Sequence, residues 1–294
     1  MKYVDVAQVQ RKLNSRLLTN NLAKTIFFIS TLLGLVVLVI LFYRVISQSL
    51  GWLDIQFLTS KLSTTAENAG IMGAILGTVW LMLVVAPITL FLGVGTAIYL
   101  EEYAKKGRLQ RFIQTNISNL AGVPSIVFGI LGLTVFVRGF GLGNIVLAGG
   151  LTMSLLVLPI VVVASQEAIR AVPGFLREAS YGMGATKWQT IKNVVLPASL
   201  PGILTGVILA LSRAIGETAP LVVIGIPALL MPLPDSLFDK FTVLPMQIYY
   251  WTIDAALVEE YANLAAATIV VLLLVLFLMN SIAIIIRNKF QRRY

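Results

Sequence analysis

Two opposite charges lie close together within a long apolar stretch of this sequence, residues 202–226. Arg213 and Glu217 are four residues apart, so a continuous helix would place them on one face, one turn from each other. Ser212 and Thr218 add hydroxyl groups beside them. A charge near the middle of a membrane costs at least about 2.5–3.5 kcal/mol, and charges that persist there commonly serve a function.

Arg213 and Glu217 together are suited to binding an oxyanion. The planar guanidinium group donates to two phosphate oxygens at once. A neighbouring carboxylate accepts a hydrogen bond from HPO4 2− or H2PO4 −, which sulfate at neutral pH lacks the proton to make. We therefore predict that Ser212, Arg213, Glu217 and Thr218 line a substrate pathway. The alternative is an ion pair that braces this segment against a neighbouring helix. The bracing role and the pathway role are compatible if the pair is closed when empty and opens around the anion.

The composition excludes several other chemistries. The 294 residues include no cysteine and no histidine, which excludes disulfides and any Cys/His metal or catalytic centre. We accordingly predict no catalytic and no metal-binding residues. The chain is 58% hydrophobic and 12% charged, whereas soluble domains are about half apolar and about a quarter charged. Its net charge of +9 comes from short basic clusters between apolar runs, which is typical of membrane proteins rather than of proteins that bind nucleic acid.

Six apolar stretches are long enough to cross a lipid bilayer as helices. A span needs about 20 mostly apolar residues. The stretches are residues 25–46, 71–100, 117–137, 145–165, 202–226 and 264–286. The first is not followed by a small-residue cleavage pattern, so we expect it to remain as an anchor. The sequence therefore predicts an all-α integral membrane protein with six transmembrane helices.

The basic residues predict the orientation of these spans. Most of the 22 lie before residue 25, between spans two and three, between spans four and five, and after residue 286. Such segments remain in the cytoplasm, so both termini are expected there. Residues 1–24 form a weakly amphipathic segment expected to lie along the cytoplasmic surface. Residues 71–286 are the expected transport core, and residues 287–294 a basic cytoplasmic tail.

A long cytoplasmic loop, residues 166–201, connects spans four and five. Pro173 and Gly174 open a short helix, and Gly184 can adopt the left-handed conformation that ends one. A second short helix follows, which Pro197 and Pro201 are expected to end before span five. The prediction is a compact helix–turn–helix that projects into the cytoplasm.

The same loop resembles the EAA signature of the permeases of bacterial ABC importers. In that pattern Glu-Ala-Ala, three residues, Gly, nine residues and Ile-x-Leu-Pro follow one another, and the spacing agrees here throughout. The matching residues are Glu178, Ala179, Ser180, Gly184, Leu196 and Pro197, with Ser180 in place of an alanine and Val194 in place of the isoleucine. The resemblance implies that this loop forms a coupling helix seated on an ATPase subunit. Arg170 and Arg177 are expected to orient the protein in the membrane or to contact that ATPase.

Other segments resemble the phosphate-specific branch of these permeases, over residues 70–286 as a whole. The motif from Arg213 to Thr218 is shared by both permease types of that branch. Its continuation through Leu221 and residues 244–249 are similar to the A-type subunit, and residues 119–129 are similar to the branch in general. The resemblance implies the type I importer fold and a place in the bacterial inner membrane.

The resemblance also implies the partners of this chain. They are a C-type permease that completes the pathway as a heterodimer, two ATP-binding subunits, a periplasmic phosphate-binding protein and inorganic phosphate. The sequence has no GxxxxGK[ST] phosphate loop. We therefore expect no cofactor on this chain, with ATP and Mg used by the ATPase subunits, and no enzymatic activity of its own.

Three other interpretations were weighed. An intramembrane enzyme would need a catalytic set, and Glu217 is the one acid well inside a predicted span. A passive channel or scaffold would not need a loop that docks on an ATPase. Among importers, phosphonate, molybdate or sulfate are the competing substrates, and competition during uptake distinguishes them.

Overall fold

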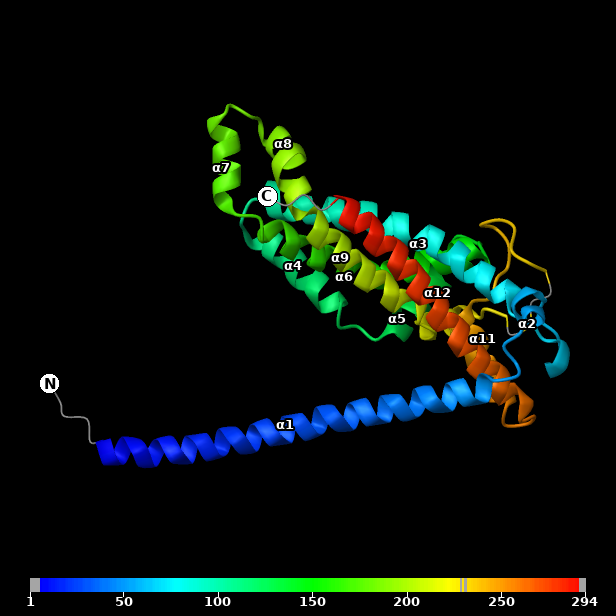
Figure 1. Ribbon diagram of the computed structural model, residues 1–294. Helices are drawn as coiled ribbons and strands as arrows, with labels where there is room; N and C mark the ends of the chain where they lie inside the picture. Colours follow the sequence, from blue (N-terminus) through cyan, green and yellow to red (C-terminus); the bar gives the residue numbers. More distant parts are fainter. Residues whose placement is uncertain (1–5, 228, 230–231, 291–294) are drawn as a thin grey trace.

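Helices make up the structure, a computed structural model that describes residues 6–227, 229 and 232–290 (Figure 1). Across those residues no strand occurs, and one isolated antiparallel bridge pairs Ile145 with Lys240. The predicted all-α class is therefore confirmed. Five helices are long and apolar enough to cross a membrane, and a bent pair makes a sixth span if it is counted as one.

The helices follow one another with mostly short connections, and a long one, residues 225–243, joins α10 to α11. The N-terminal half contains α1 (Val6–Ser49), α2 (Ile55–Thr59), a 3-10 turn (Ala66–Asn68), α3 (Met72–Ile98) with a π-helical turn (Tyr99–Tyr103), α4 (Arg108–Leu120), and α5 (Ser125–Gly132) with a π-helical segment (Leu133–Gly139). The rest contains α6 (Val146–Arg170), α7 (Gly174–Gly182), α8 (Lys187–Thr190) with a π-helical segment (Ile191–Val195), α9 (Leu196–Ile215), α10 (Ala219–Ile224), α11 (Leu244–Asp254) and α12 (Glu260–Phe290).

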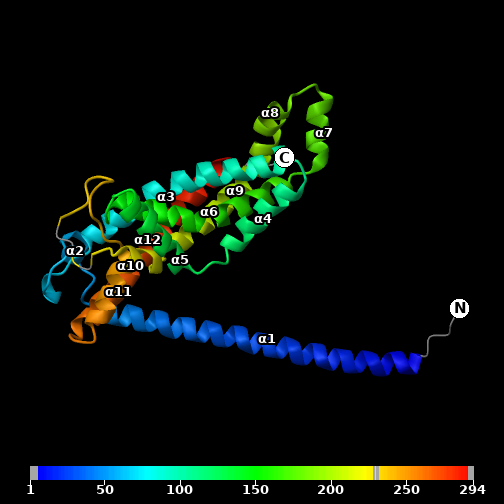
Figure 2. The same ribbon diagram turned by 180° about the vertical axis from the view of Figure 1, so that it is seen from behind.

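The core lies where α6 packs between α3 and α9 (Figures 1 and 2). Small residues allow these helices to approach closely. A Cβ atom added at Gly206 of α9 would lie 2.5 Å from the Cβ of Ala164 in α6, and one at Gly93 of α3 would lie 2.6 Å from Cγ1 of Val161. Because lipid offers no hydrophobic driving force between helices, such close van der Waals packing stabilises membrane bundles.

A second apolar cluster closes the end of the bundle that carries α2 and α11. Phe57 of α2 packs near Trp251 of α11, with ring centroids 6.1 Å apart, and Leu264 of α12 joins them.

In the adjoining loop the carboxylate of Asp239 accepts hydrogen bonds from the backbone N–H groups of Asp235, at 2.9 Å, and Ser236, at 2.7 Å. These bonds hold the pKa of the Asp239 carboxyl below its ordinary value.

The first helix differs from the expected arrangement. We predicted a surface segment over residues 1–24 and a separate span over 25–46, but α1 runs unbroken through both, over 44 residues. No proline or glycine interrupts residues 6–33, so nothing in the local sequence ends the helix before the span. Near its C-terminal end α1 lies against α12, and its other end extends away from the bundle (Figures 1 and 2).

The third predicted span, residues 117–137, is not one straight helix. Helices α4 and α5 meet at 102°. Pro124 disfavours a helical conformation at the residue before it, and Gly122 weakens the helix further. Helix α4 is amphipathic and has no buried residue, so only the part from Ser125 onward packs as a core helix does.

The chain ends and the long loop lie at one end of the molecule. The N-terminal end of α1, the C-terminal end of α12 and the α7–α8 hairpin point to the same side in both views, and α2 and α11 lie at the opposite end (Figures 1 and 2). This arrangement agrees with an even number of membrane crossings between the two ends of the chain.

Candidate functional site

The helix that carries Arg213 ends two residues later. Gly216 is the C-cap of α9, and the backbone N–H groups of Gly216 and Glu217 donate to Arg213 and Ala214, both at 3.2 Å. Glu217 therefore lies in a short break before α10. The predicted placement of Arg213 and Glu217 on one face of a continuous helix is wrong, and span 202–226 is interrupted. Gly216 and Pro220 explain the break, since neither favours a helix interior.

Arg213 and Glu217 do not form a closed pair. Within the part of the chain that the structure describes, no ion pair joins them. The Arg213 side chain is exposed and Glu217 is half-buried. Irregular backbone at membrane depth is tolerated where it is buried in protein or lines a water-filled cavity. The break therefore presents a cation and an acid that can meet a polar ligand.

The two hydroxyl residues differ in their surroundings. Ser212 Oγ lies 2.6 Å from Oδ1 of Asn280 in α12, to which it donates, and 2.7 Å from the carbonyl of Ile208. Ser212 thus fastens α9 to α12. Thr218 is the N-cap of α10, and its carbonyl accepts hydrogen bonds from Leu221 and Val222, both at 3.0 Å. Of the four predicted pathway residues, the structure gives Ser212 a bracing contact and leaves the other three around the break.

The predicted helix–turn–helix is present as a hairpin of α7 and α8 that projects from the bundle (Figure 1). Gly184 has φ of +81°, the left-handed conformation expected of it. Thr186 and Gln189 form a capping box that begins α8. The hydroxyl groups of Ser180 and Thr190 lie 2.9 Å apart and join the two helices. These contacts hold the hairpin in one conformation.

The outer face of this hairpin is open. Glu178 and Ala179 are exposed, and so are four large apolar or aromatic side chains: Phe175, Tyr181, Met183 and Trp188. Met183 at the turn is 89% exposed. A cluster of exposed apolar side chains rimmed by polar ones commonly marks a protein interaction surface.

The base of the hairpin differs from the prediction. Pro197 and Pro201 do not end a helix, because Lys187–Ile215 is continuous. The π-helical segment Ile191–Val195 precedes Pro197, and its altered hydrogen bonding accommodates a residue without an N–H group. Leu196 and Pro197 are half-buried where this helix enters the bundle. The hairpin is thus joined to α9 by continuous helix, without a flexible joint.

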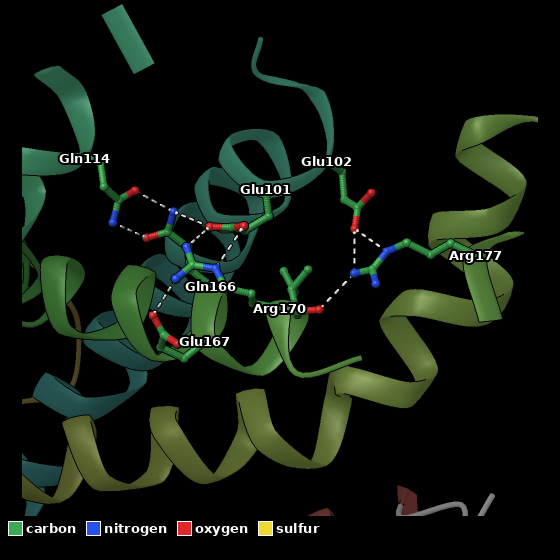
Figure 3. Close-up of polar contacts among 8 residues, drawn as sticks. Glu101, Glu102, Gln114, Gln166, Glu167, Arg170 and Arg177 are labelled. Carbon is green, nitrogen blue, oxygen red and sulfur yellow. Dashed lines mark hydrogen bonds and ion pairs between the residues drawn. The ribbon is translucent and has the colours of Figure 1, made fainter. Parts of the chain in front are cut away.

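Three acids that we did not single out from the sequence pair with Arg170 and Arg177 (Figure 3). Arg170 Nη2 donates to Glu101 Oε1 at 2.6 Å, and its Nη1 donates to Glu167 at 2.9 Å. Arg177 Nη2 donates to Glu102 Oε1 at 3.1 Å. Both arginines were expected to orient the protein in the membrane or to contact an ATPase, whereas here they bind acids within the chain. The one signal for these pairs in the sequence was two adjacent acids at the end of a predicted span, in a segment whose charged residues are mostly basic.

A buried glutamine connects the same region to α4. Gln166, 1% exposed, exchanges two hydrogen bonds with Gln114 of α4, at 2.7 and 3.0 Å, and donates to Glu101 at 3.2 Å (Figure 3). The cytoplasmic ends of α3, α4 and α6 are therefore joined by one polar network. Its buried amide has partners for both polar ends, as a buried polar group requires.

Comparisons with known proteins agree with this architecture. Residues 89–294 match the family described as the inner membrane component of binding-protein-dependent transport systems. The chain is 38% identical over 215 residues to the phosphate transport system permease protein PstA 1 of Mycobacterium tuberculosis, covering 71% of this chain and 70% of that one. It is 30% identical over 277 residues to PstA of Yersinia pestis, covering 92% and 90%. It is also 37% identical over 207 residues to the probable ABC transporter permease protein YqgI of Bacillus subtilis, covering 70% of each.

Solved structures share the fold. One is a bacterial ABC transporter that imports the acidic polysaccharide alginate, with a TM-score of 0.64 and 15% identity over 94% of this chain and 99% of that one. Another is the MetNI methionine ABC transporter in an inward-facing conformation, with a TM-score of 0.58 and 19% identity over 74% and 94%. The fold is that of an ABC importer permease, as predicted.

Permeases of this kind are multi-pass proteins that work with a binding protein and with ATPase partners. The long apolar helices, the exposed hairpin and the matched residues all agree with that role. The chain belongs to the family of inner membrane components of binding-protein-dependent transport systems.

Proposed function

We propose that this chain is one of the two permease subunits of an ATP-driven importer of inorganic phosphate. The observation that carries the proposal is its 38% identity over 215 residues to a phosphate transport permease. The second permease would be a C-type subunit that forms the other half of the pathway. Two ATPase subunits that use ATP and Mg, and a periplasmic phosphate-binding protein, would complete the system.

The break between α9 and α10 is the proposed point of contact with phosphate. Arg213 is exposed on the isolated chain, so its guanidinium group is available to a pathway formed with a second permease. Its planar fork matches phosphate oxygens, and Glu217 accepts the hydrogen bond of a protonated phosphate. The acid lies outside the helix that carries Arg213, so the two groups can separate around an anion without the helix unwinding.

The α7–α8 hairpin is the proposed coupling element. Glu178, Ala179 and Gly184 lie on or beside its exposed face, where an ATPase subunit would dock. Ser180 supports that face from within the hairpin, and Leu196 and Pro197 continue it into α9. ATP binding would move the hairpin and open the pathway outward, and hydrolysis would return it to the inward-facing state, as in alternating access.

Substrate specificity tests this proposal. The complex, reconstituted in vesicles with ATP inside and the binding protein outside, should accumulate labelled phosphate. A hundredfold excess of unlabelled sulfate, molybdate or phosphonate should lower the rate less than twofold. Sulfate lacks the ionisable proton of phosphate, molybdate is larger, and a phosphonate has a carbon substituent in place of one oxygen. Unlabelled phosphate at the same excess is the positive control. Inhibition by one of the other anions equal to that by phosphate would identify a different substrate.

A further inference from the structure

Arg177 joins three parts of the chain at the base of the hairpin (Figure 3). Its Nε and Nη2 donate to one carboxylate oxygen of Glu102, at 3.2 and 3.1 Å. Its Nη1 donates to the carbonyl of Val172 at 2.6 Å, and Nη2 also donates to the carbonyl of Ile169 at 2.9 Å. We call this group, Arg177 with Glu102 and the two carbonyls, the Arg177 clamp.

The members of the clamp come from different elements. Arg177 belongs to α7, Glu102 to the π-helical turn that ends α3, Ile169 to the last turn of α6, and Val172 to the connection between α6 and α7. The guanidinium group adds a donor to two carbonyls near this helix end, where the carbonyl of Ile169 already accepts from the backbone N–H of Val172 at 3.3 Å. Three connecting residues already tie α7 to α6 through the backbone. The contact with Glu102 is different, because it ties α7 to a helix that lies far from it in sequence.

This contact is shielded from water. The side chain of Glu102 is 9% exposed and that of Arg177 is 22% exposed. Removing one member of such a pair leaves the other charge buried without its partner. Among the hydrogen bonds and ion pairs of the described residues, it is the one that links α7 to the end of α3. Lys187 at the start of α8 adds a weaker contact, 5.1 Å above the ring of Tyr103 in the same turn.

The neighbouring pair provides a contrast. Arg170 also binds a glutamate of the π-helical turn, Glu101, but it belongs to α6 and its side chain is 54% exposed. Helices α3 and α6 already pack along their length, so this pair adds no new connection. Two adjacent glutamates thus bind two arginines seven residues apart, and only one of those arginines lies on the hairpin.

We propose that Arg177 and Glu102 are positioning residues that transmit the movement of α7 to α3. The proposal rests on the coupling role proposed above for the hairpin. With the clamp closed, a displacement of α7 acts on α3 and α6 together, and these helices form the core of the bundle. With the clamp open, α7 moves about the short connection to α6, and α3 remains where it is.

The test measures ATP hydrolysis and transport separately in the reconstituted complex. R177Q should lower phosphate transported per ATP hydrolysed at least tenfold, and it should lower the stimulation of ATP hydrolysis by the binding protein to a similar extent. Basal hydrolysis should stay within twofold of wild type. R170Q is the matched control, since it also removes one guanidinium group bound to a glutamate of the same turn, and its ratio should stay within twofold. R177K keeps the charge but cannot bridge all three acceptors, so its ratio should lie between those of R177Q and wild type.

A crosslink separates transmission from folding. The chain has no cysteine, so E102C/R177C can be joined specifically by a short bismaleimide. Transport per ATP should be low before crosslinking and should recover at least fivefold after it, whereas the E101C/R170C pair should not respond. Failure of the crosslink to restore coupling would overturn the proposal, and so would R177Q behaving like R170Q. If the binding protein stimulates ATP hydrolysis by the wild-type complex but no phosphate is taken up, only the proposed substrate is contradicted. The clamp would then be tested by the effect of R177Q and R170Q on that stimulation.

Discussion

Arg213 and Glu217 lie on either side of a helix end rather than on one face of a continuous helix. Gly216 ends α9 between them, so the carboxylate does not move with the guanidinium group as it would on one continuous helix. Arg213 is exposed, while Ser212 on its N-terminal side is held to Asn280 of α12. Because Ser212 is anchored, the backbone at Arg213 is held in place, while its guanidinium group is available to a ligand.

Replacing Arg213 should therefore lower transport strongly while leaving the complex intact. A charge-assisted hydrogen bond contributes about 1.5–3 kcal/mol, so R213Q should lower the rate of phosphate uptake by about tenfold or more. R44Q removes a charge from α1, which packs against α12 rather than against α9, and should change the rate less than twofold. Co-purification of the partner subunits is measured on the same samples. Loss of the complex in R213Q would instead identify a bracing role for this arginine.

The backbone conformation of a single residue was predicted correctly where it depends on local sequence. Gly184 has the left-handed conformation that the end of α7 requires. The partners of Arg170 and Arg177 could not be predicted, because Glu101 and Glu102 are about 70 residues away and only the packing of α3 against α6 brings them together. Pro220 gave a signal for a kink in this span, but the break at Gly216 was not located, because the apolar run continues on both sides of it and hydropathy does not change there.

At the scale of elements, the α7–α8 hairpin combines a braced interior with an open outer face. Ser180 with Thr190, the capping box of Thr186 and the Arg177 clamp hold its shape. Glu178, Met183 and the neighbouring aromatic residues are exposed. Its connection to the bundle is helical through Ile215, so a force on the hairpin reaches α9 directly.

Reversing the charge of Glu178 should uncouple the ATPase from transport. E178K places a cation on the exposed face of α7, where an ATPase subunit would dock, without removing a side-chain hydrogen bond or ion pair found among the described residues. Uptake should fall at least tenfold, while ATP hydrolysis should continue without stimulation by the binding protein. E67K makes the same change on an exposed residue at the opposite end of the molecule and serves as the control. Unchanged uptake with E178K would contradict the assignment of this hairpin as the coupling element.

The boundaries of the helices show which features hydropathy predicts and which it does not. Runs of about 20 apolar residues predicted α3, α6 and α12 closely, since burial in lipid alone determines them. The bend of 102° between α4 and α5 and the continuity of α1 depend on local backbone preferences that hydropathy ignores. Pro124 gave a signal for that bend, whereas Pro197 gave a false one because the π-helical segment accommodates it.

At the scale of the whole molecule, the chain has one well-packed core and a large apolar exterior. Helix α6 is buried between α3 and α9, whereas α1 and α12 are exposed along most of their length. An exterior of this kind faces lipid or another membrane subunit. The hairpin at one end and the α2–α11 cluster at the other are placed to meet partners on opposite sides of a membrane (Figures 1 and 2).

The most direct test of the proposed function is phosphate uptake that depends on this chain. Cells that lack their own high-affinity phosphate uptake would receive the cognate partners with or without the chain, and accumulation of labelled phosphate would be measured at low external phosphate. We predict rapid uptake only when the chain is present, abolished by depletion of ATP. An assembled complex that hydrolyses ATP but accumulates no phosphate above the control without the chain would contradict the proposal.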